Sequence, residues 1–207
     1  MLNENADIKE NAILKLSYDL LNVLLKDHTT NKNIIWATDN YKEKGPGYQF
    51  NDSINVRNIT GYNGNTIRPR ISKSKNEQAR RIKNNGEVFT PSWICNVQNN
   101  LVDNVWFGKK NVFNVELENN WKTKKAKIKF PTKTNKSFLD YIKDIRLEIT
   151  CGEAPYLVNR YDNVTGEIIK VENRIGLLDR KLRVINENTK DEKEWQELAE
   201  LAYKSIY

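Results

Sequence analysis

The segment Arg146–Leu157 constrains the fold of this chain more than any other part of the sequence. It opens with the short stretch Arg-Leu-Glu-Ile-Thr, and Cys151 and Gly152 follow at once. Such a stretch, bounded by small residues, predicts a strand that ends at Thr150. Small residues let the backbone approach a nucleotide-like ligand at the carboxyl end of a strand, so this turn is a candidate binding loop. The alternative is an ordinary strand-to-helix turn.

A second candidate, the stretch Asn85–Trp93, lies some sixty residues earlier. Its Asn-Gly pair predicts a turn, and Thr90 is expected to cap a helix with Pro91 in the first position, where the missing N–H costs nothing. Free N–H groups at such a start can bind a carboxylate or phosphate, although many capped helices are purely structural. The expected apolar face of this helix comprises Trp93, Ile94, Val97, Leu101 and Val105.

Apolar residues spaced three to four apart predict helices in other parts of the chain. We expect them at residues 8–25, 138–145 and 191–207, with a short strand at 33–37. Residues 72–83 are expected to form a basic, polar helix with hardly any apolar face. The segment 109–136 scatters its apolar residues among lysines, which suggests either a variable strand pair or an insertion.

The 207 residues suffice for one domain, or one domain with an arm. No apolar run approaches the roughly 18 residues that a membrane span needs, and the first residues lack the features of a signal peptide. We therefore expect a soluble, cytoplasmic protein that does not associate with membranes. Cys95 and Cys151 lie in unlike contexts, so they are expected to be free thiols, and no metal site is expected.

The net charge of +7 is concentrated in the middle of the chain, where residues 68–133 carry 15 basic and 5 acidic side chains. A basic block of this kind is typical of a surface that neutralises phosphates. A solvated linker helix is the alternative. The candidate nucleic-acid-binding residues are Arg68, Arg70, Lys73, Lys75, Arg80 and Arg81.

In this order, the two stretches resemble a known family. Gly86-Glu87-Val88-Phe89-Thr90-Pro91 resembles the Gly-x-x-Phe-Thr-Pro element that opens the S-adenosylmethionine domain of adenine-specific N6 DNA methyltransferases. Residues 147–157 are similar to the family's first cofactor motif, Leu-(Asp/Glu)-Pro-x-Cys-Gly-x-Gly-x-Phe-Leu. Together with residues 35–41, these motifs extend the likeness to methyltransferase subunits of bacterial restriction-modification systems over most of the chain.

The resemblance implies an α/β protein with a mixed, largely helical region (1–67), a basic connector (68–85) and the opening part of a Rossmann-like methyltransferase domain (86–207). It also implies S-adenosylmethionine as cofactor and double-stranded DNA as partner. Phe89, Thr90 and Pro91 would line the methionine end of the cofactor, and the loop beneath it would comprise Glu148, Thr150, Cys151, Gly152 and Ala154. The chain departs from the family at Ala154, where a second glycine is usual, and at Pro155.

The catalytic motif of the family is missing from this sequence. Adenine methylation needs a flipped base held by an (Asp/Asn/Ser)-Pro-Pro-aromatic loop. The residues that precede the five prolines are Gly45, Arg68, Thr90, Phe130 and Ala154. We therefore assign no catalytic residue, and we expect a truncated protein or one that needs a second chain.

Other enzyme classes fit the sequence less well. No Glu-x-Lys tripeptide of the kind used by metal-dependent nucleases occurs, and neither does a His-Glu-x-x-His zinc site or a phosphate-binding Gly-x-x-x-x-Gly-Lys loop. Two alternatives to the methyltransferase hypothesis stay open. One is a noncatalytic DNA-binding or assembly module of a restriction-modification system, and the other is a decayed fragment without a function of its own.

Overall fold

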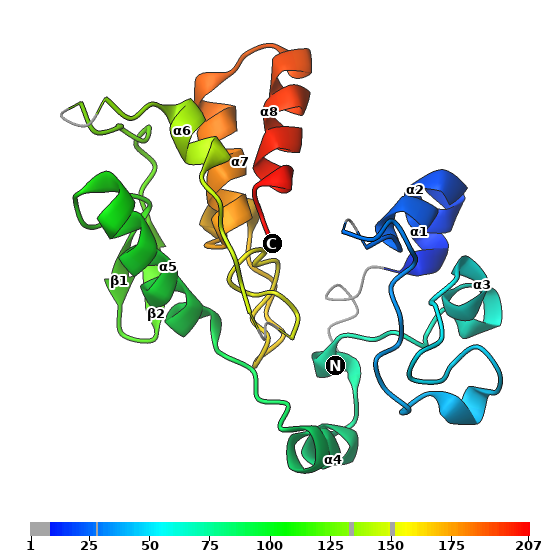
Figure 1. The fold of residues 1–207 in the computed structure, drawn as a ribbon. Coiled ribbons are helices and arrows are strands. Elements are labelled where there is room, and N and C mark those ends of the chain that lie inside the picture. Colours follow the sequence, from blue (N-terminus) through cyan, green and yellow to red (C-terminus); the bar gives the residue numbers. More distant parts are fainter. Residues whose placement is uncertain (1–8, 28, 133–134, 150–151) are drawn as a thin grey trace. The chain divides into compact units, whose positions relative to one another are not determined.

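A computed structural model describes residues 9–27, 29–132, 135–149 and 152–207 (Figure 1). These residues divide into two compact units, one that ends at Lys73 and one that begins at Ser74. Each unit has its own hydrophobic core.

The unit that ends at Lys73 contains the helices α1 (Glu10–Leu16), α2 (Tyr18–Leu24) and α3 (Val56–Ile59). The sequence predicts one helix over 8–25, whereas the structure has two, because the backbone is extended at Ser17. The Ser17 hydroxyl accepts a hydrogen bond from the Leu20 N–H and so caps α2. The strand expected at 33–37 is also wrong, because only isolated bridges form there, such as the one between Ile35 and Ser53.

The core of this unit is built around two hydrogen-bonded aromatic residues. The Trp36 indole donates to the carbonyl of Gly47 at 2.9 Å, and the Tyr48 hydroxyl donates to the carbonyl of Asn58 at 3.0 Å. The buried apolar residues are Leu21, Leu25, Trp36, Tyr48, Ile54 and Ile59.

The unit that begins at Ser74 contains the longer helices and the hairpin. Its elements are α4 (Lys75–Asn85), α5 (Ser92–Phe107), β1 (Asn114–Leu117), β2 (Asn120–Thr123), α6 (Phe138–Lys143), α7 (Leu177–Asn188) and α8 (Glu192–Lys204). The last three helices pack together, and the hairpin lies beside α5 (Figure 1). Their core holds Phe107, Phe113, Tyr141, Ile142, Val184 and Ile185, among others.

The structure is mixed in class, with helices and a small antiparallel sheet. Strands β1 and β2 pair with Val115 opposite Lys122, which agrees with the strand pair expected as one possibility in the segment 109–136. Helix α7 was not expected at all. Among the described residues, no helix is long and apolar enough to cross a membrane.

The strand expected at 146–150 is present only as a short parallel pairing with the last residues of the chain. The Arg146 N–H donates to Ser205, the Tyr207 N–H to Arg146 and the Glu148 N–H to Tyr207, all at 2.9 Å. The pairing amounts to a single bridge between Arg146 and Ile206. The prediction of a regular strand is therefore wrong for the described residues of this range. Thr150 lies outside them.

Buried Lys181 of α7 holds this pairing in place. Its ammonium donates to the carbonyls of Ile142 and Asp144 and to the Ser205 hydroxyl. Burial lowers the pKa of Lys181 to about 8. The three acceptors come from segments on both sides of α7, so one side chain connects α6, α7 and the end of α8.

Helix α5 buries its polar face, contrary to the sequence prediction. Leu101 is 61% exposed and Val105 is 84% exposed, although both were expected in the core. The buried residues of α5 are Ser92, Cys95, Asn96, Asn99, Asn100, Asp103 and Phe107.

A network of charged and amide groups explains why α5 is oriented in this way. The Asp103 carboxylate accepts hydrogen bonds from Arg180 at 2.6 Å and from the Tyr141 hydroxyl at 2.9 Å. The Arg180 guanidinium also donates to the side-chain carbonyls of Asn96 and Asn100. Buried polar groups are stable only when they are hydrogen-bonded, and here the partners come from α5, α6 and α7.

Candidate functional site

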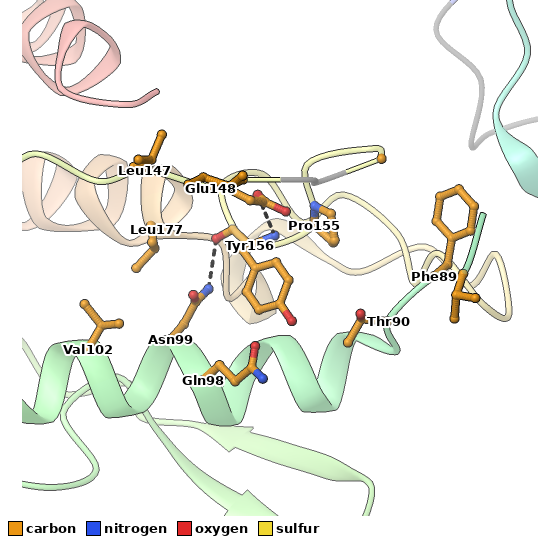
Figure 2. Close-up of a pocket in the computed structure, with 13 residues that line it drawn as sticks. Phe89, Thr90, Gln98, Asn99, Val102, Leu147, Glu148, Pro155, Tyr156 and Leu177 are labelled. Atoms are coloured by element: carbon orange, nitrogen blue, oxygen red, sulfur yellow. Dashed lines mark hydrogen bonds between the residues drawn. The ribbon is translucent and has the colours of Figure 1, made fainter. Parts of the chain in front are cut away.

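The two sequence motifs meet at one cavity of about 420 Å³ (Figure 2). Helix α5 forms one wall with Gln98, Asn99 and Val102, and Leu147 and Glu148 lie on the opposite wall. Phe89 and Thr90 lie at one end. The remaining lining residues are Val88, Ile149, Gly152, Pro155, Tyr156 and Leu177.

The Phe-Thr-Pro element enters this cavity with two of its three residues. Phe89 and Thr90 line it, whereas Pro91 does not and instead precedes the first residue of α5. The helix cap expected at Thr90 is wrong by one position. The cap group comes from far along the sequence, because the Ser92 N–H donates to the Asp162 carboxylate at 2.7 Å.

Gly152 brings the second motif into contact with the first. A Cβ atom at this position would lie 3.2 Å from Cε1 of the Phe89 ring. Its φ of +55° is a conformation that glycine adopts without a steric penalty. The two stretches, separated by some sixty residues, therefore meet at a point where no side chain separates the Gly152 backbone from the aromatic ring.

Ala154 adopts the left-handed conformation as well, with a φ of +51°. It does not line the cavity, but its carbonyl accepts hydrogen bonds from the N–H groups of Leu157 and Val158, at 3.2 and 2.9 Å. Alanine in this conformation is strained, and glycine is the usual residue there. The turn 152–155 therefore has a backbone that suits glycine at both Gly152 and Ala154.

Glu148 contributes a carboxyl group to the cavity. One of its carboxyl oxygens accepts hydrogen bonds from the N–H groups of Tyr156 and Leu157, at 3.2 and 3.0 Å. The other oxygen is buried and has no hydrogen-bond partner among the described residues. Burial raises the pKa of Glu148 to about 7, although the two N–H groups oppose this shift. Near neutral pH the carboxyl group can accept a hydrogen bond from a ligand or donate one to it.

Three residues of α5, Gln98, Asn99 and Val102, belong to this site although the sequence prediction missed them. Gln98 lines the cavity, and the Asn99 amide donates to the carbonyls of Tyr156 at 2.9 Å and Ile175 at 3.0 Å. Asn99 thereby fixes the turn to the helix. Asn96, Asn99 and Asp103 lie on one face of the helix, and this pattern could have pointed to the site. A polar stripe, however, usually predicts the face of a helix that is exposed to solvent.

Cys95 belongs to the same helix, and its side chain is buried. It is a free cysteine, and burial raises the pKa of its thiol to about 12, so it is not a nucleophile at neutral pH. Thr150 and Cys151 lie outside the described residues. Within the described part of the chain, no group of three or more His, Cys, Asp or Glu side chains is arranged to hold a metal ion.

The six basic candidates are divided between the two units. Arg68, Arg70 and Lys73 belong to the unit that ends at Lys73, whereas Lys75, Arg80 and Arg81 lie on α4. Lys73 is only 8% exposed, and Arg81 forms an ion pair with Glu87. Lys75 and Arg80 are exposed.

Comparisons with known proteins add no family to this description. No protein-family model, curated protein or solved structure matches the chain. The geometry of the site therefore carries the functional argument.

Proposed function

We propose that this chain provides the cofactor pocket of a DNA adenine N6-methyltransferase from a restriction-modification system. The observation that carries the proposal is the contact between the two motifs. Phe89 and Thr90 share one cavity with Glu148 and Gly152, and the Gly152 backbone lies against the Phe89 ring. The volume of about 420 Å³ is within the range of small-molecule sites.

The residues of this cavity fit S-adenosylmethionine, which supplies the methyl group when it is bound. The ammonium of its methionine part can donate a hydrogen bond to the unpaired Glu148 oxygen. Phe89 offers a ring face, Thr90 a hydroxyl, and Gly152 a backbone without a side chain. The parallel pairing of Arg146 with Ile206 supports a Rossmann-like arrangement, because such sheets are built from parallel strands.

Binding of the cofactor tests this proposal directly. Isothermal titration of the purified chain with S-adenosylmethionine should show one saturable site. Gly152→Trp places a large ring at the Phe89 contact, so affinity should fall about ten-fold or more, which corresponds to about 1.4 kcal/mol. Gly108→Trp is the matched control, because Gly108 has a similar φ of +64° and open space around its Cβ position. Equal affinity of the two variants, or no binding by the folded wild-type chain, would refute the pocket.

Methyl transfer needs residues that this sequence lacks. Because no Pro-Pro-aromatic motif is present, the chain alone should not transfer labelled methyl groups to duplex DNA. Adding a polypeptide that carries this motif is the complementary assay. Transfer by the chain alone would contradict the proposed division of roles.

A noncatalytic DNA-binding or assembly module is the second candidate. The strained backbone at Ala154, next to Pro155, is the observation that favours it. In that case, binding to duplex DNA would depend on exposed Lys75 and Arg80 of α4 and would fall steeply with salt. It would also survive Gly152→Trp, which distinguishes the two candidates.

A further inference from the structure

A second cavity adjoins the first turn of α5 and shares no lining residue with the site described above. It has a volume of about 1030 Å³. Its walls come from the start of α5, from the β1–β2 hairpin, which lies beside that helix in Figure 1, and from the segment 162–173. It is therefore a separate groove on the same unit.

Two half-buried tryptophans line this groove, Trp93 from α5 and Trp121 from β2. The Trp121 indole donates to the carbonyl of Asn173 at 2.9 Å, which fixes the orientation of its ring. A fixed, partly exposed indole offers a flat face for stacking at low entropic cost. Stacking of a nucleobase on such a ring contributes about 1–3 kcal/mol per base.

The charge of the groove is positive. Exposed Lys122, Lys125 and Lys170 line it, and none of the three forms an ion pair with another described residue. Two carboxylates, Asp162 and Glu167, also line the groove, so its lining carries a net charge of +1. Asp162 accepts hydrogen bonds from the N–H groups of Ser92, Val164 and Thr165, which hold its carboxylate at the backbone, whereas the side chain of Glu167 is exposed.

This combination favours a single strand over a duplex. A duplex keeps its base faces stacked inside and presents mainly phosphates, so it would contact the lysines but not two half-buried tryptophans. An unstacked strand offers base faces and phosphates together. Sugar-phosphate backbones of DNA and RNA share this chemistry.

We propose that the groove between α5, the β1–β2 hairpin and the segment 162–173 binds single-stranded nucleic acid. Bases stack on Trp121 and Trp93, and phosphates bind Lys122, Lys125 and Lys170. Cofactor binding is not required for this interaction. If the groove does not bind single strands, the methyltransferase proposal is unaffected. If the chain does not bind S-adenosylmethionine, the proposal for the groove is unaffected.

Fluorescence anisotropy of the full chain, without S-adenosylmethionine, tests the proposal. The probes are fluorescein-labelled oligo-dT and oligo-rU of about twenty nucleotides and a duplex of equal length. Three phosphate contacts predict a log–log salt slope of about −2 for the single strands. Binding of one or both single strands in preference to the duplex is the expected result, and the two arms show whether DNA or RNA is favoured.

Charge-reversal pairs locate the site. Lys122→Glu with Lys125→Glu should weaken binding at least ten-fold. The salt slope should become shallower, with a magnitude of less than about 1, because two phosphate contacts are lost. Lys190→Glu with Lys193→Glu is the matched control, since these exposed lysines have the same spacing and the same effect on net charge but lie outside the groove. The control pair should reduce affinity clearly less than the groove pair does.

Trp121→Ala gives an independent readout of stacking and should reduce affinity about ten-fold, as expected for one base stack. If this variant does not fold, the charge-reversal pairs still decide, because Lys122 and Lys125 are exposed. Preference for the duplex, absence of binding, or an equal response of the groove pair and the control pair would overturn the proposal.

Discussion

At the scale of single residues, Glu148 is a group whose protonation near neutral pH depends on the fold. Its pKa of about 7 lies above the ordinary value of 4.5 because burial disfavours the charged form. Between these two values the folded chain holds a proton that the unfolded chain has lost. The contribution of Glu148 to stability is therefore complete at low pH and is lost as the pH rises through about 7.

This shift predicts a pH dependence that one substitution removes. The free energy of unfolding should fall by up to about 3 kcal/mol through the Glu148 titration between about pH 4.5 and 8. Glu148→Gln keeps a carbonyl oxygen for the N–H groups of Tyr156 and Leu157 but does not titrate. Urea unfolding of both proteins across this range should give a smaller decrease for the variant. Parallel curves would contradict the raised pKa.

Ala154 is the other residue whose local environment makes a prediction. Its left-handed backbone costs about 1–2 kcal/mol with a Cβ atom, and glycine removes this penalty but gains entropy in the unfolded chain. The net effect of Ala154→Gly should be a stabilisation of about 0.5–1 kcal/mol. A rise in the melting temperature measures it, and a fall would show that the turn does not hold this conformation.

At the scale of elements, the orientation of α5 depends on the buried polar network around Asp103. Asp103 and Arg180 are each almost fully buried, so removing one charge leaves the other without its partner. The network connects α5 to α6 and α7. Helix α5 forms one wall of the candidate cofactor site, so the position of that wall depends on this network.

Asp103→Asn should accordingly destabilise the protein by about 3–5 kcal/mol. Glu200→Gln is the control, because it breaks the ion pair with Lys204 on exposed surface and should barely move the unfolding midpoint. Denaturant unfolding of the three proteins gives the comparison. Similar midpoints for the wild type and Asp103→Asn would show that the network contributes little.

At the scale of the whole molecule, the chain consists of two units with separate cores. Trp36 is the single tryptophan of the sequence before Ser74, and so it reports on one core alone. Ile59, which is 2% exposed, lies in the same core.

Ile59→Ala should therefore destabilise the first unit by about 2–5 kcal/mol without moving the unfolding of the second. Hydrogen exchange with mass spectrometry resolves the two by their peptides during denaturation. One coincident transition for all peptides, displaced by Ile59→Ala, would show that the units unfold together.

Local sequence patterns determined several features of this protein without tertiary information. A basic polar stretch placed α4, and apolar residues placed α6 and α8, close to their observed positions, because such signals act within one helical turn or two. The two motifs also identified Phe89, Thr90, Glu148 and Gly152, which meet at one cavity. The cofactor and DNA roles that the resemblance implies stay predictions.

Only the tertiary structure decided which face of α5 is buried, where α5 is capped and how Asn99 reaches the site. Each of these depends on a partner far along the sequence: Arg180 for Asp103, Asp162 for Ser92, and Ile175 for Asn99. A polar stripe is favourable inside a protein only when such partners complete its hydrogen bonds, and sequence periodicity contains no information about them. The strand at Arg146 is limited for the same reason, because a parallel strand extends only as far as the segment that pairs with it.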